Sequence, residues 1–93
     1  MSDKDKRDAA VDDFAKAMKA RLDEKAAQGY TGWDEHYPAG KLAHEIYNDA
    51  ARILPETGGW NDKKGIDIAN RAMMLWYRRQ GAIEAATGGE VEQ

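Results

Sequence analysis

The chain contains no cysteine, which excludes a disulfide framework, a thiolate zinc site and a cysteine nucleophile. Its longest uninterrupted apolar run is Ala72–Tyr77, far shorter than the ~20 residues needed to cross a bilayer. There is no Gly-x-Ser-x-Gly elbow and no Walker motif, so nucleophilic catalysis and glycine-loop phosphate binding are not predicted. The charged N-terminus leads into no apolar segment, so we expect no secretory signal and a cytoplasmic location.

The chain also has little excess charge of either sign, since 14 basic and 17 acidic residues give a net charge of −3. This balance is too mild to predict a nucleic-acid partner. Of the 93 residues, 42% are apolar, and this length and composition predict one folded domain spanning residues 1–93. No stretch alternates like a strand, and alanine is abundant, so the predicted class is all-α.

Apolar residues recur at helical spacing in three segments, and the predicted fold is a bundle of three main helices with antiparallel neighbours. The helices are expected at about 8–28, 38–54 and 61–80, with Gly29 after the first, Pro55 ending the second and Gly81 after the third. Asn61 or Asp62 is expected to cap the third. We expect residues 1–7 and 87–93 to be mobile.

The third segment has an apolar arc of roughly 200°, which is wider than the stripe of an ordinary surface helix. It is therefore expected at the centre of the fold or in an interface between subunits. Met73, Trp76 and Tyr77 are the residues predicted to contact a host protein or a second copy of the chain.

Two loops repeat a Gly-Trp sequence before a helix, at Trp33 and at Trp60. Each tryptophan can either close one end of the bundle as a core plug or belong to an aromatic recognition surface. The sequence leaves both interpretations open. The candidate binding surface gathers the loop aromatics with polar and aromatic residues of the third helix, namely Tyr30, Trp33, His36, Tyr37, Trp60, Asn70, Arg71, Trp76 and Tyr77.

Three carboxylates offer an alternative as metal ligands. Glu45 and Asp49 are four residues apart on one helix, and Asp67 lies on the next. The competing interpretation is that they form ion pairs at helical spacing, Glu45 with Lys41, Asp49 with Arg52 and Asp67 with Arg71. The prediction is that there is no metal site and no cofactor.

Three blocks, Phe14–Leu22, Gly32-Trp33 and Asp67–Leu75, resemble small phage and prophage proteins that are similar to the MazG-like all-α nucleotide pyrophosphohydrolases. The resemblance implies a bundle in which Glu-Glu-x-x-Glu and Glu-x-x-Asp hold Mg²⁺. Only Glu45 and Asp67 match those motifs as carboxylates, and Lys64 stands at the position of a third ligand.

The resemblance therefore implies a non-catalytic phage-type accessory protein that binds a host macromolecule and inhibits a host defence system. A Mg²⁺-dependent pyrophosphohydrolase and a nucleotide-binding sponge that does not hydrolyse its ligand are the alternatives.

Overall fold

Three α-helices and one short 3₁₀ helix make up the described part of the chain, α1 (Asp3–Ala27), α2 (Ala39–Arg52), η1 (Pro55–Thr57) and α3 (Asp62–Ala86). They come from a computed structural model that describes residues 2–34 and 37–86. Among these residues there is no strand, so the predicted all-α class with three main helices is confirmed.

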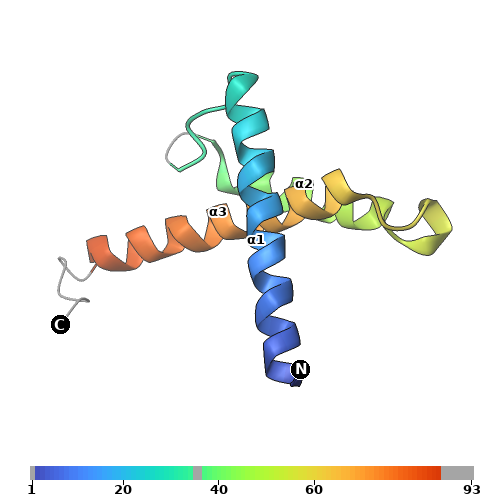
Figure 1. Cartoon of the computed structure of the whole chain (residues 1–93). Helices are drawn as coiled ribbons and strands as arrows, with labels where there is room; N and C mark the ends of the chain where they lie inside the picture. The colour runs from blue at the N-terminus through green and yellow to red at the C-terminus, as the bar shows by residue number, and fades with distance from the viewer. Residues whose placement is uncertain (1, 35–36, 87–93) are drawn as a thin grey trace.

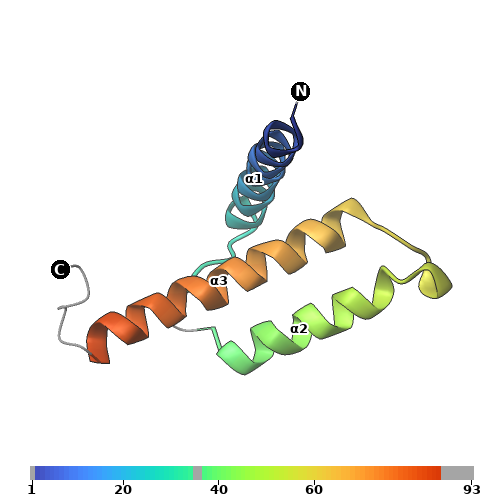
Figure 2. The ribbon, with the colours of Figure 1, turned by 90° about the horizontal axis from the view of Figure 1, so that it is seen from below.

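The arrangement of the helices is a cross rather than a parallel bundle. Figure 1 shows α1 crossing α3 steeply, while α2 runs back along α3. The prediction of antiparallel neighbours therefore holds for α2 and α3 and is wrong for α1. Figure 2 shows α3 between α1 and α2, which is the central position that its wide apolar arc predicted.

The first helix begins five residues earlier than predicted, because Ser2 caps it. The Ser2 hydroxyl accepts a hydrogen bond from the Asp5 amide at 3.1 Å. Asp3 and Asp5 lie in the first turn, where the helix dipole favours negative charge. Residues 3–7, expected to be mobile, are thus helical, and residues 1 and 87–93 lie outside the described part of the chain. At the other end Gly29 adopts a φ of +94°, as expected for a residue that follows a helix.

The ends of the other two helices follow the same logic. Pro38 precedes α2, which ends at Arg52, shortly before Pro55. The Asn61 side chain accepts a hydrogen bond from the Lys64 amide at 3.0 Å, so the predicted cap of α3 is confirmed. The predicted end near Gln80 is wrong, because Gly81 lies inside α3 with nothing packed against it and the helix continues to Ala86. The alanines at 82, 85 and 86 favour this continuation.

The buried core is very small for three helices. Leu42 is the one apolar side chain that is fully buried in the described part, and α1 contributes none. Several large apolar side chains are instead exposed on the surface, namely Val11, Phe14, Tyr30, Tyr47, Leu54, Trp60, Trp76 and Tyr77. The radius of gyration is 15.8 Å, against about 12 Å for a compact domain of this length. Side-chain contacts other than a large apolar core must therefore hold the helices together.

Candidate binding cleft

A cleft of about 620 Å³ opens where the C-terminal half of α1 and the following loop meet α2 and α3. Its walls combine aromatic rings, paired charges and one buried amide. The residues that line it are Leu22, Asp23, Lys25, Ala26, Tyr30, Thr31, Trp33, Tyr37, Lys41, Leu42, Glu45, Asp67, Asn70, Arg71 and Met74. The volume lies within the range of small-ligand sites.

Arg71 of α3 binds two carboxylates of α2. Its Nε lies 3.2 Å from Oε1 of Glu45, and its Nη1 lies 2.5 Å from Oδ2 of Asp49. The second oxygen of Glu45 accepts a hydrogen bond from the Tyr37 hydroxyl at 2.8 Å. All four side chains are largely shielded from solvent, so these contacts fix α2 against α3.

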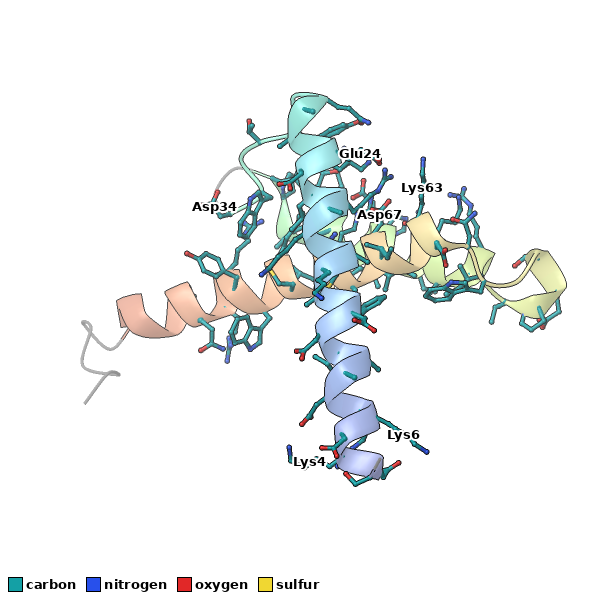
Figure 3. All side chains as sticks on the ribbon, in the orientation of Figure 1. Lys4, Lys6, Glu24, Asp34, Lys63 and Asp67 are labelled. Carbon is teal, nitrogen blue, oxygen red and sulfur yellow. The ribbon has the colours of Figure 1, made fainter. Side chains whose placement is uncertain are left out.

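A second pair joins α1 to α3. Arg21 makes two parallel hydrogen bonds to the Asp67 carboxylate, of 2.8 and 3.1 Å, and also contacts Glu24. Figure 3 labels Glu24 and Asp67 on the neighbouring helices. Partial burial opposes the ionisation of Asp67, but the Arg21 guanidinium outweighs it and holds the pKa of Asp67 below its ordinary value. The hydrogen bond that Arg21 donates to Asp67 in turn raises the pKa of Arg21.

Asn70 is the buried polar residue at the crossing of α1 and α3, with only 3% of its surface exposed. Its Nδ2 donates a hydrogen bond to the backbone oxygen of Met18 at 3.2 Å. No described group donates a hydrogen bond to its Oδ1. A buried acceptor without a donor is costly, so this amide oxygen is an unsatisfied polar group at the crossing of α1 and α3.

The aromatic loop is held on α3 by its backbone and its rings. Arg78 donates hydrogen bonds to the backbone oxygens of Tyr37 and Trp33. The Trp33 ring packs against Tyr77 of α3, with 5.4 Å between ring centroids. Burial, followed by the hydrogen bond to Glu45, raises the pKa of Tyr37, because both disfavour the charged phenolate.

Two lysines stand beside aromatic rings of the cleft. The Lys25 ammonium lies 4.8 Å from the Tyr30 ring centroid, and the Lys41 ammonium lies 5.2 Å from the Tyr37 ring centroid. Within the described residues neither lysine forms an ion pair. Their charge is therefore available to an anionic group that enters between the rings.

The structure brings five residues of the predicted binding surface into this cleft, namely Tyr30, Trp33, Tyr37, Asn70 and Arg71. Tyr77 does not line the cleft itself, but its ring packs against Trp33, which does. Trp60 and Trp76 do not belong to it: Trp60 lines a separate polar hollow beside Arg52 and Lys64, and Trp76 is 62% exposed on α3. His36 lies outside the described residues.

Trp60 is not the deeply buried plug that one interpretation predicted, because 60% of it is exposed. Its ring rests on Gly65 of α3, where a side chain would overlap it, and its Nε1 donates to Asp62 at 2.5 Å.

Sequence reasoning missed Arg21, Lys25 and Lys41 as cleft residues, and it paired the carboxylates within their own helices. Only Asp49 with Arg52 approaches the expected local pairing, at 3.9 Å. The principal partners come from other helices, because the crossing of α1 over α3 brings Arg21 to Asp67. A signal was available, since Arg21 stands directly beside the apolar residue Leu22 in the stripe of α1.

The three candidate metal ligands do not fit a divalent cation. Arg71 already binds Glu45 and Asp49, and Arg21 binds Asp67, so each carboxylate already contacts a guanidinium, which repels a further cation. In the part of the chain that the structure describes, no group of three or more histidine, cysteine or acidic side chains could hold a metal ion. The cations at these carboxylates are the two arginines rather than Lys64, which lines the hollow beside Trp60.

Comparisons of the chain with family models, with curated proteins and with solved structures found no significant match. The likeness to phage proteins and MazG-like enzymes therefore stays a prediction that rests on the residues quoted above. No helix within the described residues is both long enough and apolar enough to cross a membrane.

Proposed function

We propose that this protein acts by non-catalytic binding, and that the cleft is its recognition site. The observation that carries this proposal is the pairing of every candidate catalytic carboxylate with an arginine, inside a cleft walled by aromatic rings. An ion pair with Arg71 or Arg21 removes the negative charge that would bind Mg²⁺ or accept a proton. The rings of Tyr30, Trp33 and Tyr37 supply contact area of the kind found at binding hot spots.

The partner is a host macromolecule, as the resemblance to phage accessory proteins implies, and the effect is inhibition of a host defence system in the cytoplasm. The cleft favours a protruding segment of that partner with an anionic group. Lys25 and Lys41 attract the negative charge, and the exposed ring of Tyr30 offers a surface against which the segment packs.

A matched pair of tyrosines tests the proposal. Tyr30 in the cleft is 61% exposed and Tyr47 on α2 is 71% exposed, so neither Tyr→Ala substitution removes a core residue. We expect host proteins captured by the immobilised wild-type chain to be lost with Tyr30→Ala and kept with Tyr47→Ala. The affinity for the purified partner, measured by calorimetry, should fall at least about tenfold for Tyr30→Ala alone.

Two results would overturn this proposal. One is equal loss of the partner in both tyrosine variants, because recognition would then not involve the cleft. The other is Mg²⁺-dependent release of pyrophosphate from nucleoside triphosphates that disappears in Glu45→Gln, which would make the protein a pyrophosphohydrolase.

The second candidate function is nucleotide binding without hydrolysis. It is favoured by the aromatic rings and the two lysines of the cleft, a set that suits a base and a phosphate. Calorimetric titration of the wild type, Tyr30→Ala and Tyr47→Ala with nucleotides distinguishes this candidate. Binding that depends on Tyr30 and yields no product would place it first.

A further inference from the structure

The side of α3 opposite the cleft carries an apolar surface of its own, which we call the outer face and define by Val11, Phe14, Met73 and Trp76. α1 crosses α3 at Met18, whose backbone oxygen is bound by Asn70. The α1 residues that line the cleft, Leu22 to Ala26, all follow this crossing. The N-terminal arm of α1, residues 3–14, therefore extends on the other side of α3, as Figure 1 shows.

Trp76 belongs to the same side. At 3.6 residues per turn, two residues rotate the helix by about 200°, so Trp76 points nearly opposite to Met74, which lines the cleft. Trp76 is 62% exposed, Val11 is 66% exposed and Phe14 is 37% exposed. Met73, beside Trp76 on α3, is partly exposed.

We infer that a second copy of this chain covers the outer face, with the α1 arm of each copy packed on the Trp76 side of the other. The accessible surface of the chain is 6980 Å², against about 5,400 Å² for a compact monomer of this mass. The difference, about 1,600 Å², is twice the roughly 800 Å² that each partner buries in an interface of standard size. The single chain thus exposes enough extra surface for a stable dimer.

Helix stability supports the same conclusion. The arm projects beyond the other helices, and isolated helices of fewer than about 12–15 residues are marginal in water. Its local supports are the Ser2 cap and exposed ion pairs such as Lys4 with Asp8, which contribute little. Figure 3 shows Lys4 and Lys6 at its far end. Burial of Val11 and Phe14 against a partner supplies the apolar contact that the arm lacks.

The distribution of charged residues favours a second copy of the chain as the partner that covers the outer face. Residues 3–14 carry five acidic and three basic side chains, and residues 15–27 carry four basic and two acidic ones. The arm is thus net negative, and Arg79 is an exposed cation near Trp76 on α3. A two-fold related copy sets the negative arm of each chain against Arg79 on the Trp76 side of the other, as a self-complementary interface requires.

The oligomeric state tests this inference. By light scattering at micromolar concentration we expect twice the 10.4 kDa chain mass for the wild type. Val11→Asp and Trp76→Asp should each weaken dimerisation by more than about tenfold, because each buries a charge in the interface. Tyr47→Asp, at an equally exposed aromatic on α2, should leave the dimer intact. A monomeric wild type, or a dimer unaffected by both substitutions, would overturn the inference.

Cross-linking keeps the test decisive if a substitution disturbs folding. Since the chain has no cysteine, differently tagged Val11→Cys and Trp76→Cys chains can be mixed and treated with a short bismaleimide. We expect a covalent product that carries both tags, and none from Val11→Cys mixed with Tyr47→Cys. Equal yields from the two mixtures would refute the proposed arrangement. The outer face lies away from the cleft, so this outcome is independent of the proposed function, which the Tyr30 variant tests.

Discussion

The two sides of α3 differ in the contacts that they make with the rest of the chain. On the cleft side, Arg21 and Arg71 bind four carboxylates, Arg78 binds two backbone oxygens, and the rings of Trp33 and Tyr77 pack together. On the outer face, large apolar side chains lie exposed and the α1 arm has no cover in the single chain. The contrast teaches that polar contacts between distant segments fix this fold, whereas large apolar side chains lie on its surface, where we infer that a second copy covers them.

This division also explains how so small a core suffices. Leu42 alone cannot hold three helices, since burying one leucine contributes only about 1.5–3 kcal/mol. The arginine pairs are partly shielded and geometrically well defined, so each contributes more than an exposed surface pair would. Changes to the cleft side should therefore alter the stability of the single chain most.

The largest expected effect comes from Arg71→Ala. Removing the guanidinium leaves Glu45 and Asp49 on adjacent turns of α2, largely shielded and without their main cation. We expect the free energy of unfolding to fall by about 2–3 kcal/mol in urea titrations, near the lower end for a broken buried pair. Lys63→Ala, at an exposed position of the same helix, should change it by less than about 0.5 kcal/mol. Equal losses would abolish the contrast between the two sides.

Helix number and type, the α3 cap and the central place of α3 could be predicted from sequence, because they depend on local spacing and on capping side chains such as Asn61. The crossing of α1 could not, because it depends on contacts such as Arg21 with Asp67 that join residues 46 positions apart. The principal ion pairs join different helices, Arg21 of α1 with Asp67 of α3 and Arg71 of α3 with α2, so a rule based on local spacing assigned the wrong partners. The aromatic residues of the cleft could be grouped from the sequence because Tyr30, Trp33 and Tyr37 lie within one short loop before α2.

A smaller effect, visible in its pH dependence, is expected for Asp67→Asn. The pKa of Asp67 is lowered in the folded chain, so its contribution to stability is present above the ordinary aspartate pKa of about 3.9 and is lost as the pH falls through the lower folded value. At neutral pH we expect a loss of about 1–2 kcal/mol for a charged hydrogen-bonded pair. The stability curves of variant and wild type should converge below about pH 4.

Asp23→Asn serves as the control for Asp67→Asn, because it removes one exposed carboxylate from α1 outside the N-terminal arm. Its stability curve should stay close to that of the wild type throughout the acid range. If Asp67→Asn kept a constant difference from the wild type down to the lowest pH, the pair with Arg21 would not account for the loss.

The smallest effect is expected at Gly65, a buried glycine that is covered by a largely exposed tryptophan ring. Gly65 is buried because the ring of Trp60 rests on it, although Trp60 itself is 60% exposed. Alanine favours a helix interior over glycine by about 1 kcal/mol, but its methyl group would displace the ring. We expect these effects to offset, so Gly65→Ala should change the free energy of unfolding by less than about 0.5 kcal/mol while red-shifting tryptophan fluorescence.

A double-mutant cycle isolates that contact. Trp60→Ala alone should cost on the order of 1 kcal/mol, below the 3–5 kcal/mol typical of a buried tryptophan, because most of the ring is already in water. In the Trp60→Ala background the ring cannot be displaced, so Gly65→Ala should stabilise α3 by the full propensity gain of about 1 kcal/mol. The expected coupling is therefore about 1 kcal/mol, well above the usual additivity error. Identical effects of Gly65→Ala in both backgrounds would mean that the ring does not rest on Gly65 in solution.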